Sequence, residues 1–155
     1  MFRNVEGRQF VDVSDQMGPD FLHVGFQRGS SVGDLNNDGF VDLVVTSLME
    51  RPRILINSGG NGNHWLTLEL IGRYSNRDAI GAKVKLITAS GRVLHSHVSV
   101  SVGFMSSSDK RVHFGLGEEK EIREVDITWP RGAIQQLNHV RADQFLKVEE
   151  PLPSR

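Results

Sequence analysis

Arg92-Val-Leu-His-Ser-His-Val-Ser-Val-Ser-Val102 is the stretch of sequence that points most directly to a fold class. From Leu94 to Val102 every second residue is apolar except Ser96, and the residues between them are His95, His97 and two serines. Successive side chains of a strand point to opposite faces. The stretch therefore predicts a strand over 92–102 with one buried and one solvated face.

The same alternation recurs on both sides of this stretch. Val125, Ile127 and Trp129 fall on one phase, and Val112, Phe114 and Leu116 on another. Further strands are expected over 10–13, 41–46, 53–56, 65–71, 82–88, 111–114, 124–129 and 145–149. Glycine-rich turns separate them, and no window keeps a helical apolar period. We expect an all-β chain whose later part forms an antiparallel β-sandwich or barrel.

Composition excludes several functions. The 155 residues carry 18 Lys and Arg against 19 Asp and Glu, a net charge of −1, so nucleic acid is not an expected partner. The absence of cysteine removes disulfides and thiolate chemistry. The N-terminus is polar and charged, which is unlike a signal peptide, and no apolar run approaches the roughly 20 residues of a membrane span, so membrane insertion is not expected.

A change in composition marks an expected domain boundary. The run Asn57–Asn63 contains Asn, Gly, Ser and no apolar residue, which is typical of a linker or long turn. We therefore divide the chain into residues 1–60 and 61–155. The pattern of Phe2–Gly7 returns in Leu55–Gly60, at a spacing that propeller blades show. The first segment is expected to be part of a β-propeller blade, the end of something larger.

The most specific motif is Asp34-Leu-Asn-Asn-Asp-Gly-Phe-Val-Asp42. Oxygen-bearing side chains stand at relative positions 1, 3, 5 and 9, with glycine at position 6 where a tight turn needs it. The expected ligands are the side chains of Asp34, Asn36, Asp38 and Asp42 and the carbonyl of Phe40. Calcium takes oxygen ligands of this kind, whereas transition metals prefer imidazole or thiolate. The motif predicts a Ca²⁺ site.

Two other interpretations of the motif were weighed. An EF-hand would need a glutamate at position 12, where this chain has Val45, and helical flanks, whereas Ser31–Gly33 and Val41–Thr46 have the pattern of strands. An acidic β-turn that binds no metal is the other interpretation. A calcium loop between two strands fits the residues better.

These residues resemble a known family. Gly33–Val45 is similar to the calcium loop of FG-GAP repeats, the VCBS-like and integrin α-type propeller repeats, and Phe10–Ser14 resembles the strand that leads into a blade. The downstream motifs resemble the ASPIC/UnbV domain, which follows such propellers: Asn63–Leu66, Ser75–Ala82, His113–Gly117 and Trp129–Gly132. The resemblance implies an extracellular or cell-envelope adhesion-type protein with calcium in its propeller loop.

Other polar residues have competing interpretations. His95 and His97 share a strand face and could bind a metal, but no third ligand is evident, so a solvated pair is expected. His113 could act as a general base, yet no nucleophile-elbow context accompanies it. Gly29–Gly33 places Ser31 in a Gly-x-Ser-x-Gly register, but an acidic loop follows it instead of a helix. The Ser75–Ala82 cluster could present a recognition surface, but it is expected instead to close a loop through backbone bonds of Asn76 or Asp78.

Two classes of function remain open from the sequence. The expected one is a non-enzymatic, calcium-binding module that contacts a protein or glycan. The alternative is a metal-assisted hydrolase that uses the Asp34–Asp42 cluster. Because a lone blade leaves its faces and edges uncovered, we also expect self-association or assembly through the N-terminal segment. The apolar residues expected at that interface are Val41, Leu43, Val45, Ile54 and Ile56.

Overall fold

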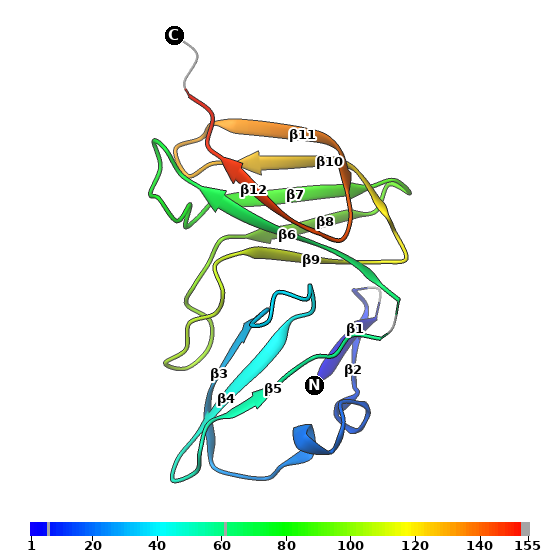
Figure 1. Ribbon diagram of the computed structural model, residues 1–155, viewed down its shortest axis with the longest axis vertical. Coiled ribbons are helices and arrows are strands. Elements are labelled where there is room, and N and C mark those ends of the chain that lie inside the picture. The colour runs from blue at the N-terminus through cyan, green and yellow to red at the C-terminus, as the bar shows by residue number, and fades with distance from the viewer. Residues whose placement is uncertain (6, 61, 153–155) are drawn as a thin grey trace.

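The computed structural model describes residues 1–5, 7–60 and 62–152. It is all-β, as predicted, and its strands fall into two parts (Figure 1). Within the described residues the helices are two single 3₁₀ turns, η1 (Ser14–Gln16) and η2 (Pro19–Leu22). Within the described ranges no helix has the length and apolar character to span a membrane. The expected boundary between residues 60 and 61 adjoins Asn61, which lies outside the described residues.

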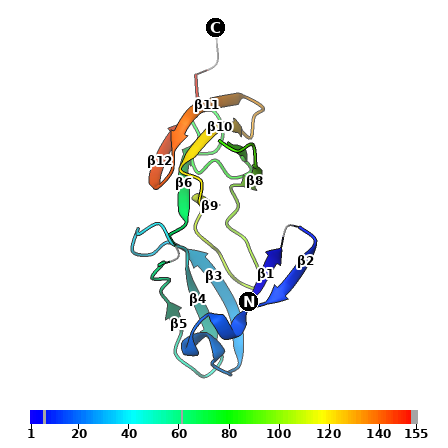
Figure 2. The same ribbon diagram turned by 90° about the vertical axis from the view of Figure 1, so that its right-hand side faces the viewer.

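The N-terminal part contains a hairpin and a small sheet. Strands β1 (Phe2–Val5) and β2 (Gln9–Asp12) form a separate two-stranded sheet. Strands β3 (Gln27–Gly33), β4 (Asp42–Ser47) and β5 (Arg53–Leu55) form an antiparallel sheet in that order. Figure 2 shows the hairpin standing apart from the sheet. The hairpin strands β1 and β2 therefore lie outside the sheet that flanks the acidic motif. The flanks of the acidic motif are strands, as predicted.

The C-terminal part is a sandwich of two open sheets, so the barrel alternative is not realised. One sheet has the order β12 (Gln144–Glu149), β6 (His64–Ile71), β9 (Val112–Gly117). The other has the order β11 (Ile134–Arg141), β10 (Glu121–Thr128), β7 (Lys83–Thr88), β8 (Val93–His97). Strand β12 runs parallel to β6, an exception to the expected antiparallel arrangement, and the other strand pairs are antiparallel.

The hydrophobic core lies between these two sheets. Its buried members all fall between Leu66 and Val148, and they include the alternating residues predicted from the sequence. Ile127 and Leu116 are fully buried, and the Trp129 side chain is 1% exposed with its Nε1 donating to Gln135. Trp129 is therefore a core residue, as expected. Burial of apolar surface is the main stabilising force of such a part.

The stretch 92–102 is a strand only in its first half. Strand β8 ends at His97, and Val98 is buried, but Val102 is 41% exposed. Beyond Val98 the chain forms a long hairpin in which the Ser108 N–H donates to the Val100 carbonyl. The hairpin leaves the sandwich and reaches β3 (Figure 1), where the Asp109 N–H donates to the Val32 carbonyl. The alternating stretch is therefore divided: its first part forms β8, and its second part pairs within the hairpin.

Strand β11 is absent from the sequence-based prediction. Its residues, Ile134 to Arg141, include two glutamines, an asparagine and a histidine, and only Val140 is buried. It is an edge strand that pairs with β10 alone. Only part of one face of β11 is covered, so its sequence alternates only weakly between apolar and polar residues. Pairing with β10 along nearly its whole length holds the strand in place.

Candidate functional site

The acidic loop 34–42 connects β3 to β4 and combines buried and exposed side chains. Asp34 begins the loop directly after β3 and is 6% exposed, and Asp42 opens β4 and is 1% exposed. Asn36 and Asp38, between them, are exposed. Gly39 has φ +91°, the left-handed conformation for which its position in the motif predicted glycine.

Backbone amides surround the two buried carboxylates. Asp34 accepts hydrogen bonds from the Asp38 N–H at 3.1 Å and the Gly39 N–H at 2.8 Å. Asp42 accepts from the Leu35 N–H and, across the sheet, from the Asn57 N–H, both at 2.8 Å. The loop is thus wound around the Asp34 side chain and closed by Asp42.

The exposed members of the motif bond to one another. Asn36 Nδ2 donates to Asp38 at 2.7 Å, and the Phe40 N–H donates to the other Asp38 oxygen at 2.9 Å. Of the five expected ligands, the structure therefore connects Asp34, Asn36, Asp38 and Phe40 by direct bonds. Asp42 joins them through the Leu35 N–H. Each carboxylate oxygen that accepts one N–H keeps a further lone pair.

The donor chemistry of this loop fits calcium. Every expected ligand atom is an oxygen, and no ion pair in the described residues involves Asp34, Asp38 or Asp42. Buried carboxylates normally have a cationic partner, because removing a lone charge from water is costly. The described part of the chain contains no group of three Asp, Glu, His or Cys side chains arranged to hold a metal ion.

The loop also touches the sandwich. A Cβ atom at Gly39 would lie 1.9 Å from Cε2 of Trp65, so the backbone of the loop rests on the indole ring of β6. At Gly59 a Cβ would lie 2.4 Å from the ring of Phe40. Glycine at these two positions permits the close approach of backbone and aromatic ring. The acidic loop therefore lies at the joint between the two parts of the chain.

Arg111 binds the joint from the sandwich side. Its guanidinium donates to the Asp34 carbonyl and to the Asn37 side chain, both at 2.8 Å. A hydrogen bond to Asp109 raises the pKa of Arg111 further, and its Cζ lies 5.2 Å from the ring centre of Phe145. Sequence reasoning missed this residue, because its partners are 74 and 77 positions away.

His113 lies in the same region as a packing residue. Its ring stacks on Trp65 with centroids 6.2 Å apart, and its Nδ1 is 2.9 Å from the Thr67 hydroxyl. Burial lowers the pKa of His113, against the opposing charge of Asp34. These neighbours hold the histidine in place. Among the described residues, no hydrogen bond joins His113 to an acidic side chain of the loop. Ser31, the residue of the Gly-x-Ser-x-Gly register, lies within β3, and an acidic loop follows it, as expected.

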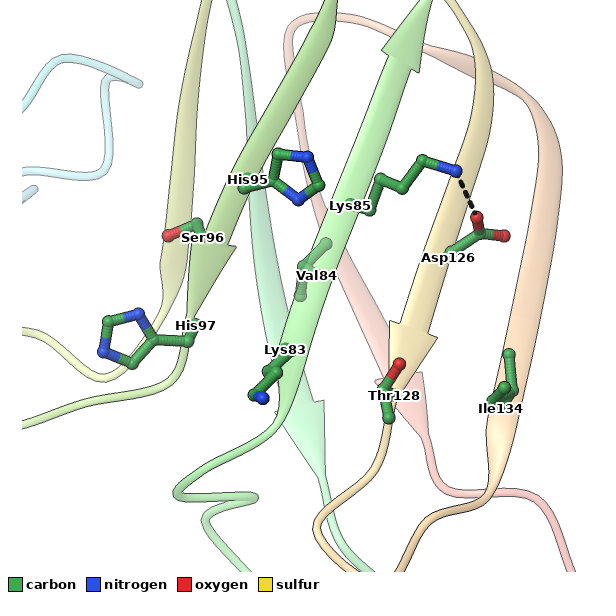
Figure 3. A pocket seen from close by; sticks show the side chains of 9 residues that line it. All are labelled: Lys83, Val84, Lys85, His95, Ser96, His97, Asp126, Thr128 and Ile134. Carbon is green, nitrogen blue, oxygen red and sulfur yellow. Dashed lines mark hydrogen bonds and ion pairs between the residues drawn. The ribbon is translucent and has the colours of Figure 1, made fainter.

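His95 and His97 are both exposed on the outer face of β8, as expected for a solvated pair. Figure 3 shows His95 beside Lys85 of the neighbouring strand β7, and Lys83 of the same strand is opposite His97 in the register. These nearby ammonium groups disfavour a divalent metal at the pair. The two histidines lie on a different sheet from the acidic loop.

The loop of residues 72–82 is held by a residue that the sequence did not suggest. Asn76 bonds both ways with the backbone of Ile80, as expected, whereas Asp78 pairs with Lys110. Glu150, 4% exposed, accepts from three successive backbone N–H groups and from a hydroxyl. The donors are the N–H groups of Arg73, Tyr74 and Ser75 and the Ser75 hydroxyl.

The environment of Glu150 strongly favours its charged form. Burial alone would raise its pKa, but the hydrogen bonds from Ser75, Arg73 and Tyr74 outweigh burial and lower the pKa to about 2. Successive N–H groups that converge on one carboxylate form an anion-binding nest. Here the nest ties residues 73–75 to the end of β12.

Two family models match the chain in order. The FG-GAP repeat model matches residues 26–65, which contain the acidic loop and β3 to β5. The model described as ASPIC and UnbV matches residues 72–154, about half of the chain. Both matches agree with the resemblance found in the sequence motifs.

The chain is also similar to curated proteins named cartilage acidic protein 1. The Mus musculus protein is 30% identical over 138 residues, which cover 83% of this chain and 21% of that protein. The Homo sapiens protein is 29% identical over 117 residues, 74% of this chain and 17% of that protein. The chain therefore spans about a fifth of the length of these relatives.

Proposed function

Because the chain belongs to the ASPIC/UnbV family and carries an FG-GAP repeat before that domain, we propose that it is a non-enzymatic extracellular interaction module. In this proposal Ca²⁺ at the 34–42 loop stiffens the joint between its two parts. The similarity to cartilage acidic protein 1 supports the extracellular setting, where calcium is abundant enough to keep a structural site filled.

The observation that carries the proposal is the place of the acidic loop. Two buried carboxylates that form no ion pair within the described part of the chain lie where Gly39 meets Trp65 and where Arg111 meets the Asp34 carbonyl. The calcium ligands would be the side chains of Asp34, Asn36, Asp38 and Asp42 and the Phe40 carbonyl. A divalent ion there supplies the missing positive charge and fixes the loop that contacts the sandwich.

The hydrogen bonds of the loop favour a structural role over the hydrolase alternative. Both buried carboxylates accept N–H groups of the backbone, which orient them for holding the loop together. A metal-assisted hydrolase needs a base placed beside an open coordination position. His113, the nearby candidate base, is bonded to Thr67 and stacked on Trp65.

Calorimetry of two variants tests the metal assignment. Asp38→Ala removes an exposed ligand without disturbing the core, so we expect calcium affinity to fall at least tenfold, about 1.4 kcal/mol. His95→Ala, on the outer face of the sandwich, should bind calcium like the wild type. Equal affinity of Asp38→Ala and wild type would overturn the assignment. Turnover of phosphoesters, glycosides or peptides by the calcium-loaded chain would favour the hydrolase.

We propose further that the N-terminal segment associates with a second copy or a stable partner. Of the five residues expected at this interface, Ile54 and Ile56 are 60% and 51% exposed, whereas Val41, Leu43 and Val45 are half-buried. Phe10 and Phe26 are each 70% exposed. Strand β5 is also an edge strand of its sheet. Exposed apolar side chains beside an unpaired edge are typical of an interface. Light scattering should find association at high concentration, and a monodisperse monomer would contradict self-association.

A further inference from the structure

Arg111 connects the sandwich to the acidic loop through one planar group. Figure 1 shows this loop at the end of the small sheet that faces the sandwich. The Arg111 side chain donates from Nη1 to the Asn37 side chain and from Nη2 to the Asp34 carbonyl, both at 2.8 Å. These acceptors are the first and fourth residues of the motif, so the two bonds span the segment that carries Asn36. A guanidinium that holds two acceptors fixes their relative position.

The guanidinium is itself held in place by residues of the C-terminal part. An Asp109 carboxylate oxygen accepts from Arg111 Nε at 2.7 Å and lies 2.6 Å from Nη2. The ring of Phe145, on β12, lies 5.2 Å from the guanidinium carbon. The Arg111 side chain is only 23% exposed. An arginine oriented in this way loses little further freedom when it bonds the loop.

The indole ring of Trp65 forms a second support for the loop. The backbone of Gly39, the sixth residue of the motif, rests on this ring. Trp65 is fixed in turn, because its carbonyl accepts the Asp143 N–H at 2.7 Å. The sandwich therefore touches the loop at Asn37 and at Gly39. These two residues flank Asp38, the exposed carboxylate among the expected calcium ligands.

Arg111 has two opposite effects on a cation in the loop. Its positive charge repels the cation, whereas its hydrogen bonds hold the loop in the shape in which the oxygen-bearing side chains are presented. The ion pair with Asp109 offsets much of the repulsion. The bonds to Asn37 and to the Asp34 carbonyl act on the loop directly. The positioning effect is therefore expected to be the larger one.

We propose that the ASPIC/UnbV domain completes the calcium site of the FG-GAP repeat, with Arg111 as the positioning residue of the loop. This inference rests on the proposed binding of Ca²⁺ at residues 34–42 and adds the regulation of that site. The factor by which docking raises calcium affinity equals the factor by which calcium strengthens docking. Calcium thus controls how firmly the two parts of the chain hold together.

Calorimetric titration of the full chain with calcium chloride tests the proposal. Arg111→Lys keeps the charge but loses the planar fork, so calcium affinity should fall about fivefold. Arg111→Gln removes the charge as well, and its affinity should also fall. A rise in the affinity of Arg111→Gln would show that repulsion dominates and would overturn the proposal. The control variants Arg123→Lys and Arg123→Gln, at an exposed position on β10, should stay within about twofold of wild type.

A double-mutant cycle isolates the contact between the two parts. Asn37 is exposed, is not an expected ligand and has φ +57°, a conformation that glycine adopts freely. Asn37→Gly therefore removes the acceptor of Arg111 without touching the sandwich. The loss of calcium affinity that it causes should be smaller, by about twofold or more, in the Arg111→Lys background than in wild type. Equal losses in both backgrounds would mean that the two residues act independently.

Hydrogen exchange provides a readout that does not depend on calcium affinity. In EDTA, Arg111→Lys should exchange faster than wild type at residues 34–42 and equally at the core residues 122–127. Calcium should slow exchange of the Asp109 N–H, which donates to the Val32 carbonyl at 3.0 Å, more in wild type than in Arg111→Lys. Equal slowing in the two proteins would contradict the coupling.

Failure of this inference and failure of the proposed calcium site are separately visible. If wild type binds no calcium, both are overturned. If wild type binds calcium and Arg111→Lys binds it equally well, only the positioning role is overturned. Should Arg111→Lys not fold, Asn37→Gly still tests the contact from the loop side, and an affinity equal to wild type would overturn the role.

Discussion

The two parts of the chain keep their order by different means. In the sandwich, buried apolar side chains from both sheets pack into one core between Leu66 and Val148. In the N-terminal part, Val13 is the buried hydrophobic residue among those described, and the other buried side chains there are Asp34 and Asp42. Hydrophobic burial therefore stabilises one part, whereas hydrogen bonds and contacts with a neighbour order the other.

The largest expected effect comes from a core deletion. Ile127→Ala removes a fully buried side chain, so the free energy of unfolding should fall by about 2 to 5 kcal/mol. The matched change Ile54→Ala, at a side chain that is 60% exposed, should cost no more than about 0.5 kcal/mol. Urea unfolding followed by circular dichroism measures both. Similar losses at the two positions would show that the N-terminal part has a core of its own or is buried by association.

The second effect tests a polar contact within the sandwich. Glu150→Gln keeps the shape but removes the charge that four donors bind, so stability at pH 7 should fall by about 2 kcal/mol. Glu149→Gln, its exposed neighbour, should have a much smaller effect.

The pH dependence of this contact has a definite sign. The pKa of Glu150 is about 2 in the folded chain, below its ordinary value of 4.5. Its contribution is therefore complete above about pH 4.5 and disappears as the pH falls towards 2. The stability difference between wild type and Glu150→Gln should shrink over this range in urea titrations. A constant difference would contradict the role assigned to the carboxylate.

The third effect separates the joint from the core. Gly39→Ala places a methyl group against Trp65 and forces alanine into a left-handed conformation, which alone costs about 1 to 2 kcal/mol. Gly81→Ala shares the positive φ but meets no atom within 4 Å. Only Gly39→Ala should increase hydrogen exchange in residues 34–42 and alter the fluorescence of Trp65. Equal exchange in both variants would mean that the loop does not depend on this contact.

The smallest effect is expected from removing the N-terminal part altogether. A fragment that begins at Asn63 keeps every buried member of the sandwich core. It should fold cooperatively without calcium, and its free energy of unfolding should stay close to that of the full chain, because the contacts that it loses at Trp65 and Arg111 lie outside the sandwich core. Circular dichroism and proton NMR check this. An unfolded fragment would refute the boundary at residues 60 and 61.

The fold was predictable wherever one side of a strand is buried and the other is not. The apolar phases of Val112–Leu116 and Val125–Trp129 are core residues, and the flanks of the acidic motif are strands. Strand β11 escaped prediction because an edge strand depends on its pairing partner more than on its own alternation. The end of β8 escaped because Val98–Val102 changes partner without changing its pattern.

The candidate site was predictable only in part. The motif predicted the loop and its oxygen-bearing residues, because all of them lie within nine consecutive positions of the sequence. Its setting was not predictable, because Trp65 and Arg111 reach it only through the fold. The same holds for Glu150, whose donors precede it by 75 to 77 residues. Long-range partners of this kind leave no local pattern.

The parallel pair of β12 and β6 has a consequence for how the chain is made. Strand β6 begins the sandwich at His64, yet the register that completes its sheet pairs Leu66 with Gln144 and Ile71 with Glu149. During synthesis, β6 emerges long before its partner exists, and its apolar residues stay partly uncovered while the intervening strands are made. Pairings so distant in sequence also form slowly. A ribosome that stops before residue 144 therefore releases a sandwich without its closing strand, a natural target for chaperones and proteases.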